Sequence, residues 1–91
     1  MPYVHNIKGT SDRDPKGYSS WLEFWEDKKG KTKSLCSNLH CANKLEVGAH
    51  VQKDGATDKH WYITPLCKPC NNKKESFYVS DDDLVRVTED D

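Results

Sequence analysis

The strongest periodic pattern in the chain predicts a helix from Ser20 to Lys29. Ser20 and Glu23 form a capping box, in which each side chain bonds the backbone N–H of the other residue. Gly30 follows the last lysine and suits a helix C-cap. Because the chain has few apolar residues, we interpret the aromatic side chains of this helix as core rather than as a base-stacking platform. The apolar face comprises Trp21, Leu22, Phe24 and Trp25.

Alternating apolar and polar residues predict a strand from Leu45 to Lys53. Asp54-Gly55 then signals a hairpin turn. The returning strand is expected from Lys59 to Pro65. The pattern predicts that one face of the first strand points into the protein core, and this face consists of Leu45, Val47, Ala49 and Val51.

The flanking segments are less regular. Residues 1–18 show no sustained periodicity, so we expect an irregular lead-in with a candidate edge strand near Tyr3 to Ile7. Cys67 to Ser76 predicts a knuckle and a short helix with a proline in its first turn. Two short strands, Phe77–Val79 and Leu84–Val87, are expected around an acidic turn, and the acidic tail 88–91 is expected to fray.

Composition limits the core that these elements can build. The 91 residues suit one domain, of which 34% are hydrophobic and 32% charged. Domains this small and polar usually need a disulfide, a metal or oligomerisation. The N-terminal residues lack an apolar signal region, and no apolar run reaches the length of a membrane span. We therefore expect a cytoplasmic protein without a membrane partner, in which paired cysteines bind metal rather than form disulfides.

The four cysteines form two pairs, C-x4-C and C-x-x-C. The spacing between the pairs accommodates a hairpin, and the second pair begins a predicted helix. This order of knuckle, hairpin and helix is the layout of a treble-clef finger, with a core at 36–76. Four cysteine ligands leave no open coordination position, so we expect one structural Zn²⁺. The predicted ligands are Cys36, Cys41, Cys67 and Cys70.

Two alternatives concern these cysteines. His40 stands beside Cys41, and sites with three cysteines and one histidine are also common, although this would leave Cys41 as an unexplained thiol. The other alternative is a redox dithiol at Cys67 and Cys70, but the presence of the additional pair, Cys36 and Cys41, and the missing thioredoxin-like pattern argue against it.

Charge is distributed unevenly along the chain. The net charge is −1, but Lys28 to Lys74 holds ten lysines against three acids. Acids gather near the end, from Asp81 onward. The basic middle suggests weak, salt-dependent contacts with DNA or RNA phosphates, and the alternative is a solvated surface. The candidate phosphate-binding residues are Lys53, Lys68, Lys73 and Lys74.

Two histidines lie near the predicted hairpin. A strand histidine such as His50 is usually packed or solvated. His60 is expected across the same hairpin, so the two imidazoles are candidates for a second divalent ion, although no further ligands are evident.

The run from Cys36 to Lys74, and ITPLCKPCNNKK within it above all, resembles the zinc-containing branch of the HNH endonucleases. The resemblance implies a ββα-metal unit in which His50 is the general base, Asn71 occupies the final His/Asn position, and a divalent ion stabilises the scissile phosphate. Two positions depart from the family pattern. Ala49 stands where a metal-binding Asp is usual, and Tyr62 stands near the position of an orienting Asn.

We therefore expect an α+β, zinc-stabilised, treble-clef-like (HNH-like) domain with an N-terminal helix and a central β-hairpin. The favoured function is a nucleic-acid-binding module without efficient cleavage, because a methyl group at Ala49 cannot coordinate a metal. The alternatives are an HNH-type endonuclease that uses His50 and a protein-interaction module.

Overall fold

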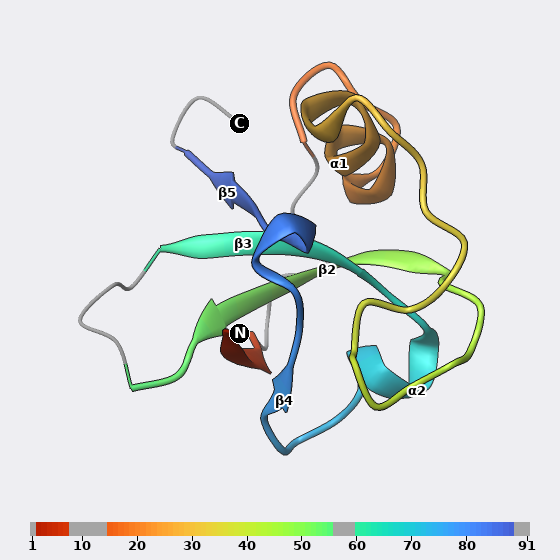
Figure 1. The fold of residues 1–91 in the computed structure, drawn as a ribbon. Coiled ribbons are helices and arrows are strands. Elements are labelled where there is room, and N and C mark those ends of the chain that lie inside the picture. The colour runs from red at the N-terminus through yellow and green to blue at the C-terminus, as the bar shows by residue number, and fades with distance from the viewer. Residues whose placement is uncertain (1, 8–14, 56–59, 89–91) are drawn as a thin grey trace.

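The computed structural model describes residues 2–7, 15–55 and 60–88. Within these ranges the chain forms a five-stranded antiparallel sheet in the order β4-β1-β2-β3-β5, with two α-helices and one 3-10 turn (Figure 1). The fold is therefore α+β, as predicted. The strands are β1 (Tyr3–Asn6), β2 (Val47–Lys53), β3 (Trp61–Leu66), β4 (Phe77–Tyr78) and β5 (Val85–Val87). The helices are α1 (Trp21–Lys29) and α2 (Lys68–Asn71), and the 3-10 turn is η1 (Asp81–Asp83).

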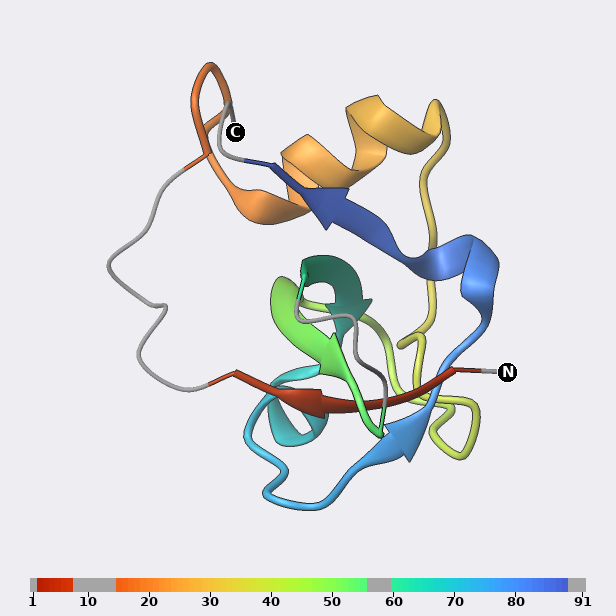
Figure 2. The ribbon, with the colours of Figure 1, turned by 90° about the vertical axis from the view of Figure 1, so that its left-hand side faces the viewer.

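The two helices lie on opposite faces of the sheet (Figures 1 and 2). On the α1 face, Ile63 of β3 packs with the aromatic residues of the helix. On the α2 face, Ala49 and Val51 of β2 pack with buried cysteines. The sheet therefore separates two cores, and the one on the α2 face includes three buried cysteines.

Helix α1 confirms the prediction from Ser20 to Lys29. The Ser20 hydroxyl accepts a hydrogen bond from the Glu23 N–H at 3.1 Å, and Gly30 ends the helix in the left-handed conformation with φ 69°. The Glu23 carboxylate accepts a hydrogen bond from Ser19. The aromatic cluster is core, as predicted, because the structure buries Trp21, Phe24 and Trp25.

Helix α1 approaches the sheet closely at Gly48. A Cβ atom there would lie 2.6 Å from the backbone nitrogen of Leu22 and 2.6 Å from the carbonyl carbon of Trp21. Backbone atoms cannot rotate away as a flexible side chain does. Because Gly48 has no Cβ, the first turn of α1 can pack directly against β2.

We expect Gly48→Ala to lower the free energy of unfolding by about 1–3 kcal/mol, the usual cost of overpacking. Urea denaturation measures the change. Gly55→Asn is the matched control, because Gly55 has no atom within 4 Å of an added Cβ and asparagine tolerates its φ of 68°. An unchanged urea midpoint for Gly48→Ala would contradict the close approach.

The central hairpin confirms the sequence pattern. Strands β2 and β3 pair in antiparallel register from Val47↔Leu66 to Val51↔Tyr62. Both strands begin two residues later than predicted, and the predicted start at Lys59 lies outside the described residues. Short strands around an acidic turn are also confirmed, as β4 and β5 flank η1.

The expected edge strand near Tyr3 to Ile7 is wrong in its placement. Strand β1 lies inside the sheet, where it pairs with β2 on one side and with β4 on the other. Its Val4 side chain is fully buried. The physical reason is that β4 returns from the far end of the chain to cover the second side of β1. Part of the lead-in, residues 8–14, and the end of the acidic tail, 89–91, lie outside the described residues.

The carboxylate of Asp54 ties β1 to two other segments. It bonds the His5 ring and accepts a hydrogen bond from the Ser76 hydroxyl, while the Asp54 N–H donates to the Tyr3 carbonyl at 2.7 Å. Hydrogen bonding to Ser76, and then to His5, holds the pKa of Asp54 below its ordinary 3.8. This residue therefore links β1, the end of β2 and the segment before β4.

Asp54→Asn is expected to reduce stability at neutral pH by about 1–2 kcal/mol, through weakened charge-assisted hydrogen bonds. Because the folded pKa is lowered, the contribution is fully present above the unfolded value near 3.8 and disappears as pH falls through the folded value. Urea unfolding at several pH values from 6 to 8 tests this, with the exposed Glu75→Gln as control. The deficit of Asp54→Asn should stay constant over this range, which lies above both pKa values, and equal stability of Asp54→Asn and wild type would contradict it.

Candidate metal centre

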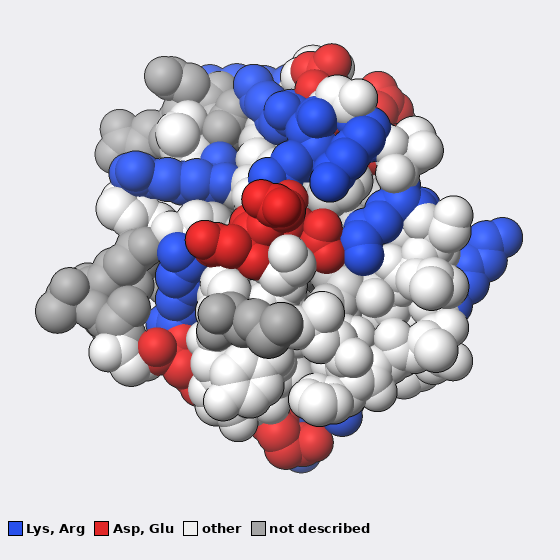
Figure 3. All heavy atoms as spheres, in the orientation of Figure 1, with Lys and Arg blue, Asp and Glu red and all other residues white. Residues whose placement is uncertain are grey.

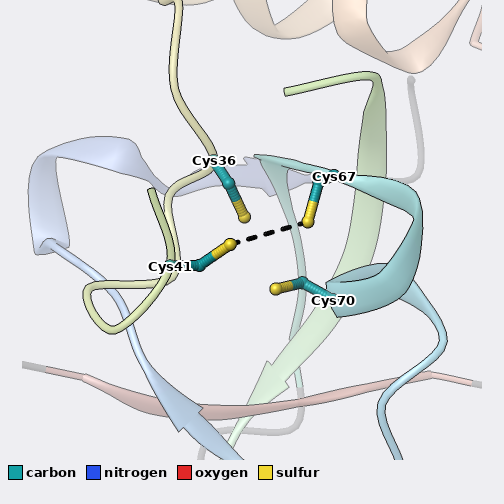
Figure 4. A group of neighbouring side chains, drawn as sticks. All are labelled: Cys36, Cys41, Cys67 and Cys70. Carbon is teal, nitrogen blue, oxygen red and sulfur yellow. Dashed lines mark hydrogen bonds between the residues drawn. The ribbon is translucent and has the colours of Figure 1, made fainter. Parts of the chain in front are cut away.

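Four cysteine sulfurs from two distant segments meet beside the sheet (Figure 4). One pair comes from the loop that precedes β2, and the other comes from the junction of β3 and α2. All four thiols are free, and their sulfur atoms lie within 4.8 Å of one another. Within the described ranges, they are the only histidine, cysteine or carboxylate group of three or more that is placed to hold a metal. The sulfurs belong to Cys36, Cys41, Cys67 and Cys70.

The spacing of these sulfurs fits a metal ion. A tetrahedral site with Zn–S bonds of about 2.3 Å separates its sulfurs by about 3.8 Å. The Cys41 and Cys67 sulfurs are 3.7 Å apart, which is far longer than the roughly 2.05 Å of a disulfide. His40 is exposed and does not belong to the cluster, whereas Cys41 does. The donor set is therefore four sulfurs, which suits a soft divalent cation.

Backbone hydrogen bonds fix the first cysteine loop. Cys36 N–H donates to the Asn43 carbonyl at 2.9 Å, and Cys41 N–H donates to the Asn38 carbonyl at 3.0 Å. Ser37 N–H reaches the Pro65 carbonyl at 2.9 Å and anchors the loop to β3. These bonds turn the loop tightly enough to bring two side chains to one point.

The second pair is positioned by the end of β3. Cys67 is the N-cap residue of α2, and Pro69 lies in its first turn, as predicted. The helix is a single turn of four residues, so a helix macrodipole contributes little to the thiolates. The backbone N–H of Cys70 instead donates a hydrogen bond to the Cys67 sulfur, and this local bond favours the thiolate.

Three of the four cysteine thiols have shifted pKa values in the metal-free protein. Burial raises the pKa of the Cys67 thiol, but hydrogen bonds from Cys70, Cys41 and Asn43 outweigh burial and bring that pKa down to about 7. Burial also raises the pKa of Cys36, and it raises that of Cys70 to about 12. A coordinated divalent cation offsets such a cost, since coordinated thiols are deprotonated. A bound cation would therefore stabilise the thiolate forms that burial disfavours.

Three asparagines support the site and were not predicted. The side-chain amide of Asn38 donates to the Cys70 sulfur at 3.4 Å, and that of Asn43 donates to the Cys67 sulfur at 3.8 Å. Each stands two residues after a cysteine of the first pair, and this repeated C-x-N spacing is the signal that could have identified them. The Asn6 amide donates to the carbonyls of Cys70 and Lys73, at 2.8 and 3.0 Å, and ties β1 to α2. A lone asparagine in an early strand carries no comparable signal.

His50 faces away from the cysteine cluster. Its ring is 6% exposed and packs edge-on against Trp21 and Trp61, with centroids 4.6 and 5.8 Å apart. Alternation along β2 points His50 toward α1 and Ala49 toward the cysteines, so His50 does not face the start of α2. His60 is exposed and contacts Arg86. Neither histidine belongs to a group of three candidate metal ligands in the described chain.

The remaining predicted residues lie around α2 and the hairpin. Asn71 is the last residue of α2, and its N–H donates to the Cys67 carbonyl at 3.0 Å. Tyr62 packs against the cysteine core, and the Lys53 ammonium lies 5.0 Å from the centre of its ring.

Of the other predicted lysines, Lys68 and Lys74 are exposed. Lys73 is exposed as well and lies 3.7 Å from the Glu75 carboxylate. The structure thus places these three lysines at the two ends of α2, whereas Lys53 lies at the end of β2.

Comparisons with known proteins leave the site to be interpreted from its own geometry. Neither helix in the described ranges is long and apolar enough to cross a bilayer. No protein-family model matches the chain, and no curated protein or solved structure is significantly similar to it.

Proposed function

We propose that this chain is a small binding module whose fold depends on one structural Zn²⁺ held by Cys36, Cys41, Cys67 and Cys70. The arrangement of the four sulfurs carries the proposal, because a closed set of thiolates at tetrahedral spacing is the usual donor set of structural zinc. Zinc supplies no reaction chemistry in such a site, since no position is open for water or substrate.

The order of elements around the sulfurs supports a treble-clef-like arrangement. A cysteine loop leads into the β2–β3 hairpin, and the hairpin leads into a helix whose start carries the second pair. This is also the order in the zinc-containing HNH family that Cys36 to Lys74 resembles. We propose kinship with that fold, without its catalysis.

Metal content tests the zinc proposal. Protein purified without added metal, and then given a slight excess of Zn²⁺ and desalted, is expected to retain one zinc per chain by elemental analysis. Cys70→Ser is expected to lose that zinc, whereas His40→Ala retains it, because His40 lies outside the cluster. Equal retention by Cys70→Ser, or loss of zinc in His40→Ala, would overturn the ligand assignment.

The absence of catalysis is proposed from the surroundings of His50. A general base must reach a water or substrate proton, and His50 is packed between two tryptophans beneath α1. Its neighbour Ala49 provides no carboxylate for a divalent ion. We expect supercoiled plasmid to remain intact with Mg²⁺, Mn²⁺ or Ni²⁺. Nicking by wild type that is lost in His50→Ala would establish the nuclease instead.

Nucleic-acid binding is a second candidate function, favoured by the exposed lysines at the two ends of α2. Lys68, Lys73 and Lys74 stand within one short segment, where phosphate contacts by several cations are additive. A gel-shift titration with DNA and RNA at about 50 mM and about 200 mM salt tests it. Binding that falls with salt and with Lys73→Gln/Lys74→Gln would support this function, and no shift at low salt would remove it.

A further inference from the structure

The largest exposed apolar side chains of the described chain include three that lie together. Tyr3 and Tyr78 are paired across β1 and β4, their ring centroids are 4.5 Å apart, and each is 43% exposed. The Leu39 N–H donates to the Tyr78 carbonyl at 3.0 Å, and Leu39 is also 43% exposed. We call Tyr3, Leu39 and Tyr78 the β4 patch. Single exposed apolar residues are ordinary, and neighbouring ones offer a partner a continuous apolar contact.

The β4 patch has an acidic border. Strand β4 leads within a few residues into η1, where Asp81 and Asp82 are exposed. Figure 3 shows acidic atoms over η1 and basic atoms on the side of η1 that faces α1. Asp83 in the same turn is buried and paired with Lys33 at 3.1 Å. Asp81 and Asp82 therefore offer exposed carboxylates three and four residues after Tyr78.

We propose that the β4 patch binds a protein segment that presents an apolar side chain next to lysines or arginines. The two tyrosine rings and Leu39 provide an apolar contact, and tyrosine faces also attract cations and the aliphatic stems of basic side chains. Asp81 and Asp82 complement the flanking positive charges and repel phosphate, so this surface suits a basic polypeptide and not a nucleic acid. The acidic border thus decides the chemistry of the partner.

This inference goes beyond the zinc proposal and requires only the folded chain. Leu39 belongs to the first cysteine loop, however, so every variant is compared in its zinc-loaded form and its metal content is measured. A variant that loses zinc reports on the fold, and a variant that keeps zinc but loses binding reports on the patch. The two failures are therefore distinguishable.

The probe is a short fluorescent peptide with a central Leu-Trp-Leu between two runs of lysine, titrated by fluorescence anisotropy. We expect binding that weakens about tenfold, or about 1.4 kcal/mol, in Tyr78→Thr and in Asp81→Asn/Asp82→Asn. Threonine retains the strand preference of the tyrosine. Leu35→Ser is the matched control, because Leu35 is 51% exposed but lies outside the patch, and its affinity should equal that of wild type. The same peptide with glutamate in place of lysine should not bind.

Other results would overturn the proposal. No binding of the lysine peptide, or equal affinity in wild type and in the patch variants, removes it. Equal binding of a peptide of lysines alone would show charge attraction without apolar recognition. Dimers or larger species in light scattering that disappear in Tyr78→Thr would assign the patch to a second copy of this chain. DNA or RNA binding that the same variants abolish would assign it to nucleic acid.

Discussion

Removal of the metal is expected to unfold the domain. Apparent free energies of zinc binding to small zinc domains reach about 10–16 kcal/mol at neutral pH, whereas whole domains are stable by only about 5–15 kcal/mol. The α2-face core includes the buried Cys36, Cys67 and Cys70. Without a cation, these thiols no longer join the loop before β2 to the start of α2. Only 34% of the residues are hydrophobic, so apolar burial elsewhere offsets little of this loss.

Circular dichroism during titration with a strong chelator measures this effect. We expect the sheet signal to fall as metal is removed and to return when Zn²⁺ is added back. Lower pH should favour release at the same chelator concentration, because protons compete with the metal for thiolates. Cys70→Ser should resemble the chelated protein even with zinc present. A chelated wild-type protein with an unchanged spectrum and melting temperature would show that the cysteines do not stabilise the fold.

Trp25→Ala is expected to produce the largest loss of stability among substitutions outside the metal centre, about 3–5 kcal/mol. Trp25 is fully buried between α1 and the sheet, and its indole N–H donates to the Asp83 carbonyl at 2.9 Å. Alanine removes the largest fully buried side chain of that core and leaves the buried Asp83 carbonyl without its donor. The bond also holds η1 against α1, so this turn should loosen as well.

Urea unfolding of the zinc-loaded protein measures the Trp25 effect. Trp25→Phe is the informative control, because it keeps an aromatic ring but removes the N–H, and we expect it to lose less than Trp25→Ala. The two cores lie on opposite faces of the sheet, so the folded fraction of Trp25→Ala should still retain one zinc per chain. A loss below about 1 kcal/mol would contradict a core role for this residue.

The sequence predicted the parts of the fold that depend on local signals. Ser20, Glu23 and Gly30 mark a helix without reference to anything distant, and Asp54-Gly55 marks a turn in the same way. The four cysteines could be grouped because few other arrangements explain two close pairs in one small domain. Their grouping is confirmed, since the four sulfurs meet at one point.

What the sequence did not predict depends on contacts between distant segments. The position of β1 follows from its pairing with β4, which no local pattern of residues 3–7 records. The direction of His50 follows from which element covers each face of β2. Alternation separated Ala49 from His50 correctly, but only the placement of α1 shows that His50 is the residue beneath the helix.

The interior position of β1 has a consequence for the order of folding. Contacts between residues close in sequence form before contacts that must close long loops. The β2–β3 hairpin is comparatively local, whereas His5 and Asp54, at the β1–β2 contact, are 49 residues apart. Strand β1 should therefore join the sheet late, after the hairpin has formed and the cysteines have met. Because the Asn6 amide bonds the carbonyls at the end of α2, the arrival of β1 completes the enclosure of the metal centre and should slow metal exchange.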